Sequence, residues 1–412
     1  MTGRRAYGGR ALRAAAVGAL AACLVAGPAG LTALASAQAS TRTAETDPVV
    51  APSGTSAPAS SAGPVVDAVP MLAYYYIWFD PSSWDRAKKD TPLLGRYSSD
   101  ERAVMRRHIE LARSAGIDGF LVSWKDTPKL TERLHRLVEI AREQHFKLGI
   151  VYQGLDFARR PIPVAKVAAD LALLADTYAK DPVFDVVGKR PLVVWTGTDQ
   201  FSDADLRRAV DPVRDRLSML ASARSIEQWR RVHDLFEGNA YYWSSVNPVK
   251  TWYPRELSEM GQAVHATGDL WVAPAASGFD ATLVGGKTVV DRANGRTLAS
   301  ELATAVRSTA DVIGLISWNE FTENSHVEPS RLYGSTALEV VAGFTGSGSP
   351  LPVLDSGATG TGSAAGGLNG VAALSVMFVG LGALLVWRLW RRSPDDAGGG
   401  VPRPRGRHAE AR

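Results

Sequence analysis

This sequence has almost no cysteine and no common metal-binding pattern. Cys23 is the only cysteine among 412 residues, so no disulfide can form within the chain. A chain of this length buries enough apolar surface to fold without one. The seven histidines are scattered and show neither H-x-H nor H-E-x-x-H spacing, patterns that are typical of zinc sites. We therefore expect no metal and no cofactor.

Other functional signatures are missing as well. The sequence has no G-x-S-x-G elbow of a serine hydrolase and no glycine-rich phosphate loop after a strand. Positive charge is also scarce in the middle of the chain. The net charge of +4 comes from the tails, because residues 1–40 and residues 388–412 each carry +4 and the residues between them carry −4. A nucleic-acid partner is therefore not expected.

The N-terminal segment is typical of an export signal. Residues 1–37 combine four arginines, an apolar run and the small-residue site Ala35-Ser36-Ala37. Cys23 completes a sequence similar to a bacterial lipobox, but the apolar run continues beyond it, which leaves lipidation at Cys23 open. Residues 38–66 are rich in Ser, Ala, Thr and Pro, a composition that predicts a disordered linker.

The C-terminal segment predicts a membrane anchor. Residues 346–370 are rich in Gly, Ser and Thr and indicate a second linker. Residues 371–390 are mostly apolar and long enough for one transmembrane helix, which needs ~17–25 residues. Residues 391–412 form a basic tail, which the positive-inside rule places in the cytoplasm. We therefore expect a single-pass protein of the cell membrane, with its folded domain outside.

The central region, residues 67–345, alternates short apolar runs with amphipathic segments. Eight apolar runs predict strands, and a helical pattern separates each strand from the next. The predicted strands are residues 71–79, 117–123, 147–152, 190–196, 218–221, 239–243, 269–274 and 312–318. The fold class is therefore predicted as α/β, a (β/α)8 TIM barrel, which takes ~250 residues. An open doubly wound sheet is the alternative.

Two carboxylates follow the last predicted strand. The apolar run of residues 312–316 changes abruptly to Trp318, Asn319, Glu320, Phe321, Thr322 and Glu323. In a barrel, residues at the C-terminal ends of the strands carry the chemistry. Cleavage of a glycosidic bond needs two carboxyl groups, one to protonate the leaving oxygen and one to act across the anomeric centre. Glu320 and Glu323 are the candidates for these roles.

The same stretch resembles glycoside hydrolase family 99, the endo-α-mannosidases. Residues 318–329, W-N-E-F-T-E-N-S-H-V-E-P, are similar to the closing motif of that family, W-N-E-W-H-E-G-T-x-I-E-P. Residues 74–79 and 94–124 contain further similar stretches. The resemblance implies an α-mannoside substrate cleaved internally with retention. It also implies that Glu320 is the base on the sugar 2-hydroxyl and that Glu323 is the acid on the leaving oxygen.

Candidate binding residues lie at the ends of the predicted strands. Aromatic rings can stack on sugars while their polar atoms bind hydroxyls, and strand alternation places Tyr76 and Trp78 on one face. The resemblance implies that Trp124 is a sugar platform and that Asp280 lies in a segment similar to P-G-[FY]-D. A bond from Asn319 or from a tyrosine hydroxyl would help to keep Glu320 ionised. The predicted substrate-binding set is Tyr76, Trp78, Trp124, Tyr242, Asp280, Trp318 and Asn319.

One part of the family pattern is missing. Family 99 enzymes usually carry a glutamate after the third strand, in an H-x-E-P-Y-like stretch. The corresponding residues 151–156 read V-Y-Q-G-L-D, and Gln153 is the nearest polar group. Glutamine can bind a hydroxyl but carries no charge. This departure predicts an altered choice of substrate, or weak activity on standard endo-mannosidase substrates.

The sequence thus predicts a membrane-anchored extracellular glycoside hydrolase that acts on α-linked oligo- or polysaccharides, α-mannosides in particular. Two alternatives stay open. The barrel could be a cell-surface glycan-binding module with weak or no turnover, or it could hydrolyse α-glucans, as the related family 71 does. The presence of both Glu320 and Glu323 favours an enzyme over a binding module. The sequence does not identify the glycan or its linkage.

Overall fold

The computed structural model describes residues 69–347, apart from residues 157, 243, 244, 246, 247, 249 and 251. The predicted export signal (residues 1–37), the first linker (38–66), the membrane helix (371–390) and the basic tail (391–412) lie outside the described residues, as does nearly all of the second linker. Among the residues that are described, no helix is both long and apolar enough to cross a bilayer.

Eight parallel strands form the central sheet. They are β1 (Met71–Tyr76), β2 (Gly119–Trp124), β3 (Lys147–Gln153), β4 (Leu192–Thr196), β5 (Ser218–Leu220), β6 (Gly238–Ala240), β7 (Leu270–Ala276) and β10 (Val312–Ile316). Their order is β5-β4-β3-β2-β1-β10-β7-β6. A parallel bridge between Ala221 and Asn239 joins the ends of β5 and β6 and closes the sheet. The predicted (β/α)8 barrel is confirmed, and closure excludes the open doubly wound sheet.

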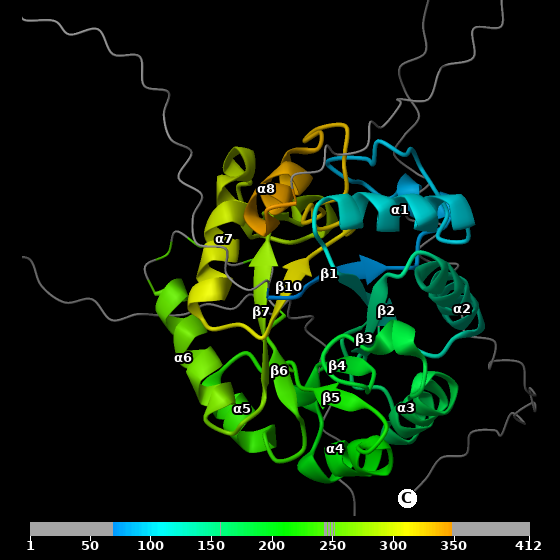
Figure 1. Cartoon of the computed structure of the whole chain (residues 1–412), viewed down its shortest axis with the longest axis vertical. Coiled ribbons are helices and arrows are strands. Elements are labelled where there is room, and N and C mark those ends of the chain that lie inside the picture. The colour runs from blue at the N-terminus through cyan, green and yellow to red at the C-terminus, as the bar shows by residue number, and fades with distance from the viewer. Residues whose placement is uncertain are drawn as a thin grey trace, which may run out of the picture. The chain divides into compact units, whose positions relative to one another are not determined.

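Helices form a ring around the strands (Figure 1). Several begin where the sequence supplies a capping oxygen: Thr127 caps α2, Ser202 caps α4 and Ser225 caps α5 by accepting a backbone N–H from the first turn. The helices are α1 (Arg102–Ser114), α2 (Pro128–Glu143), α3 (Val164–Tyr178), α4 (Asp203–Val210), α5 (Ile226–Val232), α6 (Tyr253–His265), α7 (Arg296–Arg307) and α8 (Thr336–Thr345).

The core has two layers that follow from strand alternation. Side chains on the inner face of the strands fill the barrel, and those on the outer face pack against the helices. Tyr74 lies in the inner layer and Tyr75 in the outer layer, as alternation predicts. Gly314 on the neighbouring strand leaves room for the ring of Tyr74, because a Cβ there would lie 2.9 Å from Tyr74 Cε2. The Tyr74 ring can therefore lie against β10 because residue 314 has no side chain.

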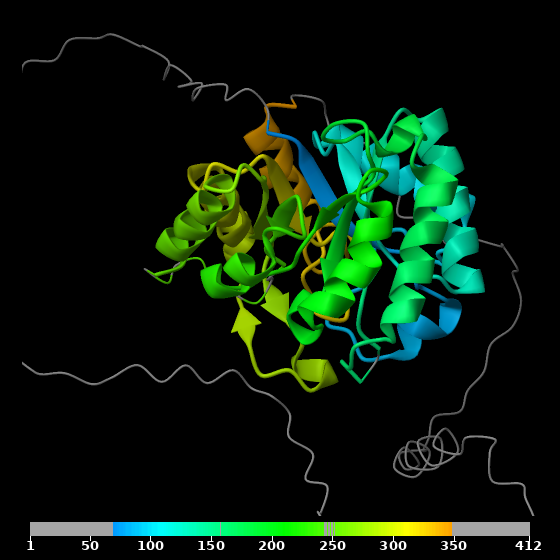
Figure 2. The same cartoon turned by 90° about the horizontal axis from the view of Figure 1, so that it is seen from below.

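A short hairpin at one end of the barrel was not predicted. It consists of β8 (Phe279–Asp280) and β9 (Val289–Val290), which pair in antiparallel fashion. Figure 2, in the view turned by 90°, shows it as yellow-green arrows that project from the barrel. Each strand has only two residues, too few for an alternation pattern to appear in the sequence. The hairpin matters because Asp280 belongs to it.

A buried carboxyl group on α7 makes stability depend on pH. Glu301 is 2% exposed and accepts a hydrogen bond from the Tyr253 hydroxyl at 3.0 Å. Burial raises the pKa of Glu301 from 4.5 to about 8. A group whose folded pKa lies above its unfolded value contributes stability that is complete below pH 4.5 and is lost as pH rises through 8.

We therefore expect Glu301→Gln to flatten the pH dependence of the melting temperature between pH 5 and pH 8. The wild-type melting temperature should fall more steeply across that window than that of the variant. Calorimetry at a series of pH values measures both curves. Glu339→Gln, a change of an exposed carboxylate on α8, should leave the slope unchanged. Parallel curves for wild type and Glu301→Gln would contradict the prediction.

Candidate active site

The loop after β10 carries both predicted catalytic carboxylates. It folds back on itself through backbone hydrogen bonds from Ser317 N to Ser325 O (3.0 Å), Ser325 N to Glu320 O (3.2 Å) and Val327 N to Ser317 O (2.8 Å). We refer to residues 317–328 as the catalytic loop. Because its two ends are joined, Glu320 and Glu323 lie on one tight turn at the C-terminal end of β10.

Glu320 is held in a buried position. Its side chain accepts a hydrogen bond from Thr322 N at 2.9 Å, and its own backbone N–H donates to Ser317 Oγ at 2.9 Å. Burial, and then the charge of Glu323, raises the pKa of Glu320 to about 7. The bonds from Thr322 and the charge of Lys88 act in the opposite direction. Only 6% of Glu320 is exposed.

Glu323 is partly buried and lies beside Glu320. Burial raises its pKa, and the charge of Arg159 lowers it. Its backbone oxygen accepts a hydrogen bond from Asp280 N at 2.7 Å, which ties the turn to the β8–β9 hairpin. Two like charges at close range disfavour the doubly ionised state. The pair can therefore keep one proton near neutral pH, which is what an acid and a base acting together require.

Three of the predicted aromatic residues come together beside this pair. The hydroxyl groups of Tyr76 and Tyr242 are hydrogen-bonded to each other. Burial raises the pKa of Tyr76. The charges of three neighbours raise this pKa further: Tyr242, Glu320 and Glu323. Both carboxyl groups therefore influence the Tyr76 hydroxyl. Trp78 packs against Tyr76 with ring centroids 4.4 Å apart and stays 39% exposed. The ends of β1, β6 and β10 thus combine hydroxyl groups, an exposed indole and two carboxyl groups.

The structure gives two other predicted binding residues a packing role. Trp124 is 1% exposed, and its Nε1 donates to Thr131 at 3.3 Å. Trp318 is fully buried against Phe120, with ring centroids 5.3 Å apart. Neither indole presents a face to a ligand in this structure. Both are large apolar rings inside the strand–helix layer, where burial is more favourable than exposure.

Asn319 joins two strands instead of contacting Glu320. Its Oδ1 accepts from Tyr76 N at 2.8 Å, and its Nδ2 donates to Tyr76 O at 3.0 Å. The side chain is fully buried, so it is not available to a substrate. At the end of β1, the Asn319 side-chain amide thus takes the place of a backbone hydrogen-bonding partner from a neighbouring strand. The hydrogen bond that we expected from Asn319 to Glu320 is provided by Thr322 N.

Asp280 lies in the β8–β9 hairpin, where its carboxylate pairs with Lys89. It also accepts a hydrogen bond from Thr282 Oγ1 at 2.6 Å. The bonds from Lys89 and Thr282 lower the pKa of Asp280 to about 2. Asp280 therefore fixes the backbone of Glu323 and is itself already paired.

Sequence reasoning missed the residues that support the catalytic loop. Arg292 is buried, and its Nη2 donates to His326 O at 2.7 Å and to Asn324 O at 3.0 Å. The same nitrogen lies 3.3 Å from His326 Nδ1. If Nδ1 accepts this bond, Nε2 carries the proton and donates to Asp90 Oδ2 at 3.2 Å. No sequence motif marks Arg292 or Asp90, because both lie outside the strand ends.

Burial lowers the pKa of His326 to about 4, so the imidazole is neutral at physiological pH. Its ring stacks on Phe321, with centroids 3.9 Å apart. His326 therefore supports the turn between Glu320 and Glu323 by packing and neutral hydrogen bonds.

A second buried group, Glu328, accepts a hydrogen bond from Tyr97 at 2.8 Å and lies 3.1 Å from His108 Nε2. Glu328 thus anchors the end of the catalytic loop to α1 and its preceding segment.

At the end of β3, Gln153 occupies the stretch where the sequence lacks the glutamate of the family pattern. Gln153 Nε2 donates to Ser123 Oγ at 3.0 Å. Farther along the same connection, Arg159 contributes positive charge near Glu323. The β3 connection therefore places a cation, Arg159, near Glu323. Among the described residues, no group of three or more His, Cys, Asp or Glu side chains could hold a metal ion.

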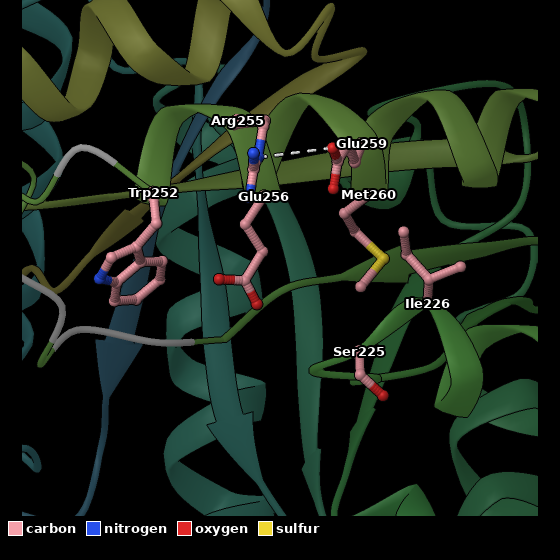
Figure 3. Close-up of a pocket in the computed structure, with 7 residues that line it drawn as sticks. All are labelled: Ser225, Ile226, Trp252, Arg255, Glu256, Glu259 and Met260. Carbon is pink, nitrogen blue, oxygen red and sulfur yellow. Dashed lines mark ion pairs between the residues drawn. The ribbon is translucent and has the colours of Figure 1, made fainter. Parts of the chain in front are cut away.

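A hollow of about 320 Å³ lies at the start of α5 and α6. Figure 3 shows its lining residues, with Trp252 at one side, the Glu256 carboxylate directed into the space, and the Arg255–Glu259 ion pair above. None of the predicted site residues lines this hollow. A second hollow, of about 290 Å³, is lined by Lys88, Lys89, Asp90, Thr91, Arg331 and Leu332. Lys88 and Asp90 connect this second hollow to the catalytic loop.

Comparison with protein-family models gives no match, and comparison with curated proteins gives none either. Solved structures do match. A GH99 endo-α-mannosidase from Bacteroides thetaiotaomicron, in complex with Bis-Tris propane, has a TM-score of 0.61 and 19% identity, over 68% of this chain and 97% of its own. The chain shares the fold of this enzyme. A second structure of a GH99 endo-α-mannosidase from the same organism gives a TM-score of 0.60 and 17% identity, over 69% of this chain and 99% of its own.

A glycoside hydrolase-like protein has a TM-score of 0.51 and 16% identity, over 68% of this chain and 96% of its own. The alignments cover nearly the full length of each of these three proteins. At such low identity, the likeness concerns the fold. The resemblance to GH99 that the sequence predicted is therefore confirmed at the level of the barrel.

Proposed function

We propose that this protein is a glycoside hydrolase that cleaves α-mannosides within a glycan. The observation that supports the proposal most is the pair Glu320 and Glu323, on one turn past β10 and beside the hydroxyl of Tyr76. Two neighbouring carboxyl groups that repel each other when both are ionised can keep one proton between them. One group can then act as an acid and the other as a base on the same glycosidic bond. The shared fold with GH99 endo-α-mannosidases supports the choice of substrate.

In this proposal, Glu320 is the base and Glu323 is the acid. The Thr322 N–H and the charge of Lys88 favour ionised Glu320. When Glu320 is ionised, its charge opposes loss of the proton from Glu323. Glu320 then takes the proton of the sugar 2-hydroxyl, whose oxygen bonds to the anomeric carbon as the glycosidic C–O bond breaks and Glu323 gives its proton to the leaving oxygen. Water, losing a proton to Glu323, then attacks the anomeric carbon, and the 2-oxygen regains its proton from Glu320, so the configuration is retained overall. The exposed face of Trp78 is the surface offered to a sugar ring.

The experiment that tests this function is a product analysis of the full-length chain on a panel of α-mannans and α-glucans. Chromatography identifies the oligosaccharides released, and NMR shows the anomeric configuration of the first product. We expect internal cleavage of an α-mannoside with retention. Products from α-glucans alone would favour the α-glucan hydrolase. Binding of glycans without products, at any enzyme concentration, would favour the glycan-binding module.

We also propose that the barrel lies outside the cell, anchored by a helix within residues 371–390. This proposal rests on the apolar composition of that segment and on the arginines around its end. Protease added to intact cells should then remove the barrel and leave a small C-terminal fragment, detected with a tag on the cytoplasmic tail. A barrel that stays intact until the cells are lysed would contradict this orientation.

A further inference from the structure

The hollow of about 290 Å³ beside the catalytic loop is built from two joined segments. Arg331 N donates to Thr91 O at 2.9 Å, and Leu332 N donates to Asp90 Oδ1 at 2.9 Å. A further bond from Leu93 N to Pro329 O, also 2.9 Å, continues the connection. The walls of the hollow are therefore fixed relative to each other by these hydrogen bonds, two between backbone groups and one to the Asp90 side chain.

The lining of this hollow carries more positive than negative charge. Three of its residues are cations, Lys88, Lys89 and Arg331, and only Asp90 is an acid. Asp90 already accepts bonds from Leu332 N and from His326, and Lys89 already pairs with Asp280. The two remaining cations, Lys88 and Arg331, form no ion pair with any residue that the structure describes.

Lys88 is held in place by contacts other than an ion pair. Its ammonium group donates to the carbonyl oxygens of Ser83 and Arg86 and lies 5.4 Å from the centre of the Trp84 ring. These partners are dipoles and a ring, not charges. The Arg331 side chain makes no hydrogen bond within the part of the chain that is described, and its exposed guanidinium lines the same hollow. Lys88 and Arg331 thus line one hollow without an ion-pair partner among the described residues, and an anion bound there would be attracted to both charges.

The hollow also adjoins the reacting groups. The charge of Lys88 acts on the carboxyl of Glu320. On the other side, the ion pair of Lys89 and Asp280 leads to the backbone of Glu323 through the 2.7 Å bond from Asp280 N. An anion in this hollow would therefore lie on the side of the catalytic loop that carries both carboxyl groups.

We propose that this hollow binds an anionic substituent of the substrate, a phosphate monoester or a carboxylate carried by a sugar unit. The Arg331 guanidinium offers a planar fork that matches either oxyanion, and Lys88 adds a point charge. The inference rests on the proposed function and names the class of substrate: an acidic glycan rather than a neutral one.

The test measures binding and hydrolysis separately on the full-length chain. Calorimetric or NMR titration at low salt compares mannose 6-phosphate, mannuronate and mannose. We expect an acidic sugar to bind about tenfold more tightly than mannose, as a charge-assisted contact allows. Whichever of phosphate and carboxylate binds more tightly identifies the substituent. High salt should reduce the preference, since the cations are solvent-accessible.

Arg331→Ala should remove the preference for the acidic sugar and leave hydrolysis of a neutral aryl α-mannoside unchanged, because Arg331 has no part in the catalytic loop. Arg331→Lys should restore part of the preference. Arg208→Ala is the matched control: it removes an exposed arginine from α4, on a distant strand–helix unit, and should not alter binding.

Equal affinity for mannose and both acidic sugars would overturn the inference, as would an unchanged preference in Arg331→Ala. Tight binding of inorganic phosphate that gains nothing from an attached sugar would also overturn it. If neutral α-mannosides are hydrolysed without any acidic preference, only this inference fails. If an Arg331-dependent preference appears without hydrolysis of any glycan, this inference stands and the proposed function fails.

Discussion

Glu320→Gln and Glu323→Gln should each lower the rate of glycan hydrolysis by about 10²-fold or more, the loss typical of a positioned proton-transfer group. Glutamine keeps the size and hydrogen-bonding capacity of the side chain but can neither take nor give the proton. Steady-state kinetics on the best α-mannoside of the panel measures the loss, and it should appear in kcat. A folded variant with wild-type turnover would contradict the assignment and would favour the glycan-binding module.

The Glu320 variant should also be more stable than wild type at neutral pH. The pKa of Glu320 is raised from 4.5 to about 7 in the folded protein. Its contribution to stability is therefore complete below pH 4.5 and is lost as pH rises through 7. Removing the carboxyl removes that loss, which we place at ~1–3 kcal/mol at neutral pH. The gain in melting temperature should be largest at or above pH 7 and should disappear near pH 4.5.

Glu328→Gln provides the contrast on the same loop. This carboxylate is 1% exposed and bonded to Tyr97 and His108, so it has the partners that Glu320 lacks. Replacing it should lower the melting temperature, because the Tyr97 and His108 bonds would be weakened. The two glutamates should thus respond in opposite directions in thermal melts. The same direction for both would mean that burial of Glu320 carries no cost.

Arg292→Met should give the second large effect, a loss of stability of ~2–5 kcal/mol together with a loss of activity. Arg292 satisfies the carbonyl oxygens of Asn324 and His326, both in the catalytic loop. Its guanidinium also lies over the Tyr333 ring, 4.1 Å from the centroid. Methionine fills similar space but leaves the Asn324 carbonyl without its donor and the His326 carbonyl with only the bond from Ser277 Oγ at 3.2 Å. The loop should then lose the shape that places Glu320 and Glu323 together.

Chemical denaturation and kinetics measure these two effects of Arg292→Met. Arg296→Met is the matched control, because Arg296 is an exposed arginine at the first position of α7. That variant should differ from wild type by no more than ~0.5 kcal/mol, the usual range for surface changes. If Arg292→Met keeps full activity, the loop holds its shape without the arginine and the supporting role is wrong.

The barrel and the carboxylate pair could be predicted because their signals are local. Strand alternation, helical spacing and capping residues such as Thr127 and Ser202 act over two to four neighbouring positions. Glu320 and Glu323 lie three residues apart directly after an apolar run, so the parallel α/β pattern alone places them at the mouth of a barrel. Eight such units in one region then predict a closed sheet.

Which aromatic rings face the site could not be predicted in the same way. Tyr76 and Trp124 both end predicted strands, and tyrosine and tryptophan suit a sugar surface and a core equally. Tyr76 meets Tyr242, 166 residues away, whereas Trp124 packs into the strand–helix layer. The direction of each ring depends on barrel closure and on where each strand ends, and a short sequence pattern contains neither.

By itself, the sequence determined that this region folds as a (β/α)8 barrel and that two glutamates follow its last strand. Only the tertiary structure decided how these glutamates are held and charged. Asn319 reaches back to Tyr76, 243 residues earlier, and Asp90 supports His326 across 236 residues. Such contacts form when distant segments meet, and burial then raises the pKa of both carboxyl groups. Periodicity records which face of a strand or helix is apolar, but the partner of a buried polar group is set by the packing of the whole barrel.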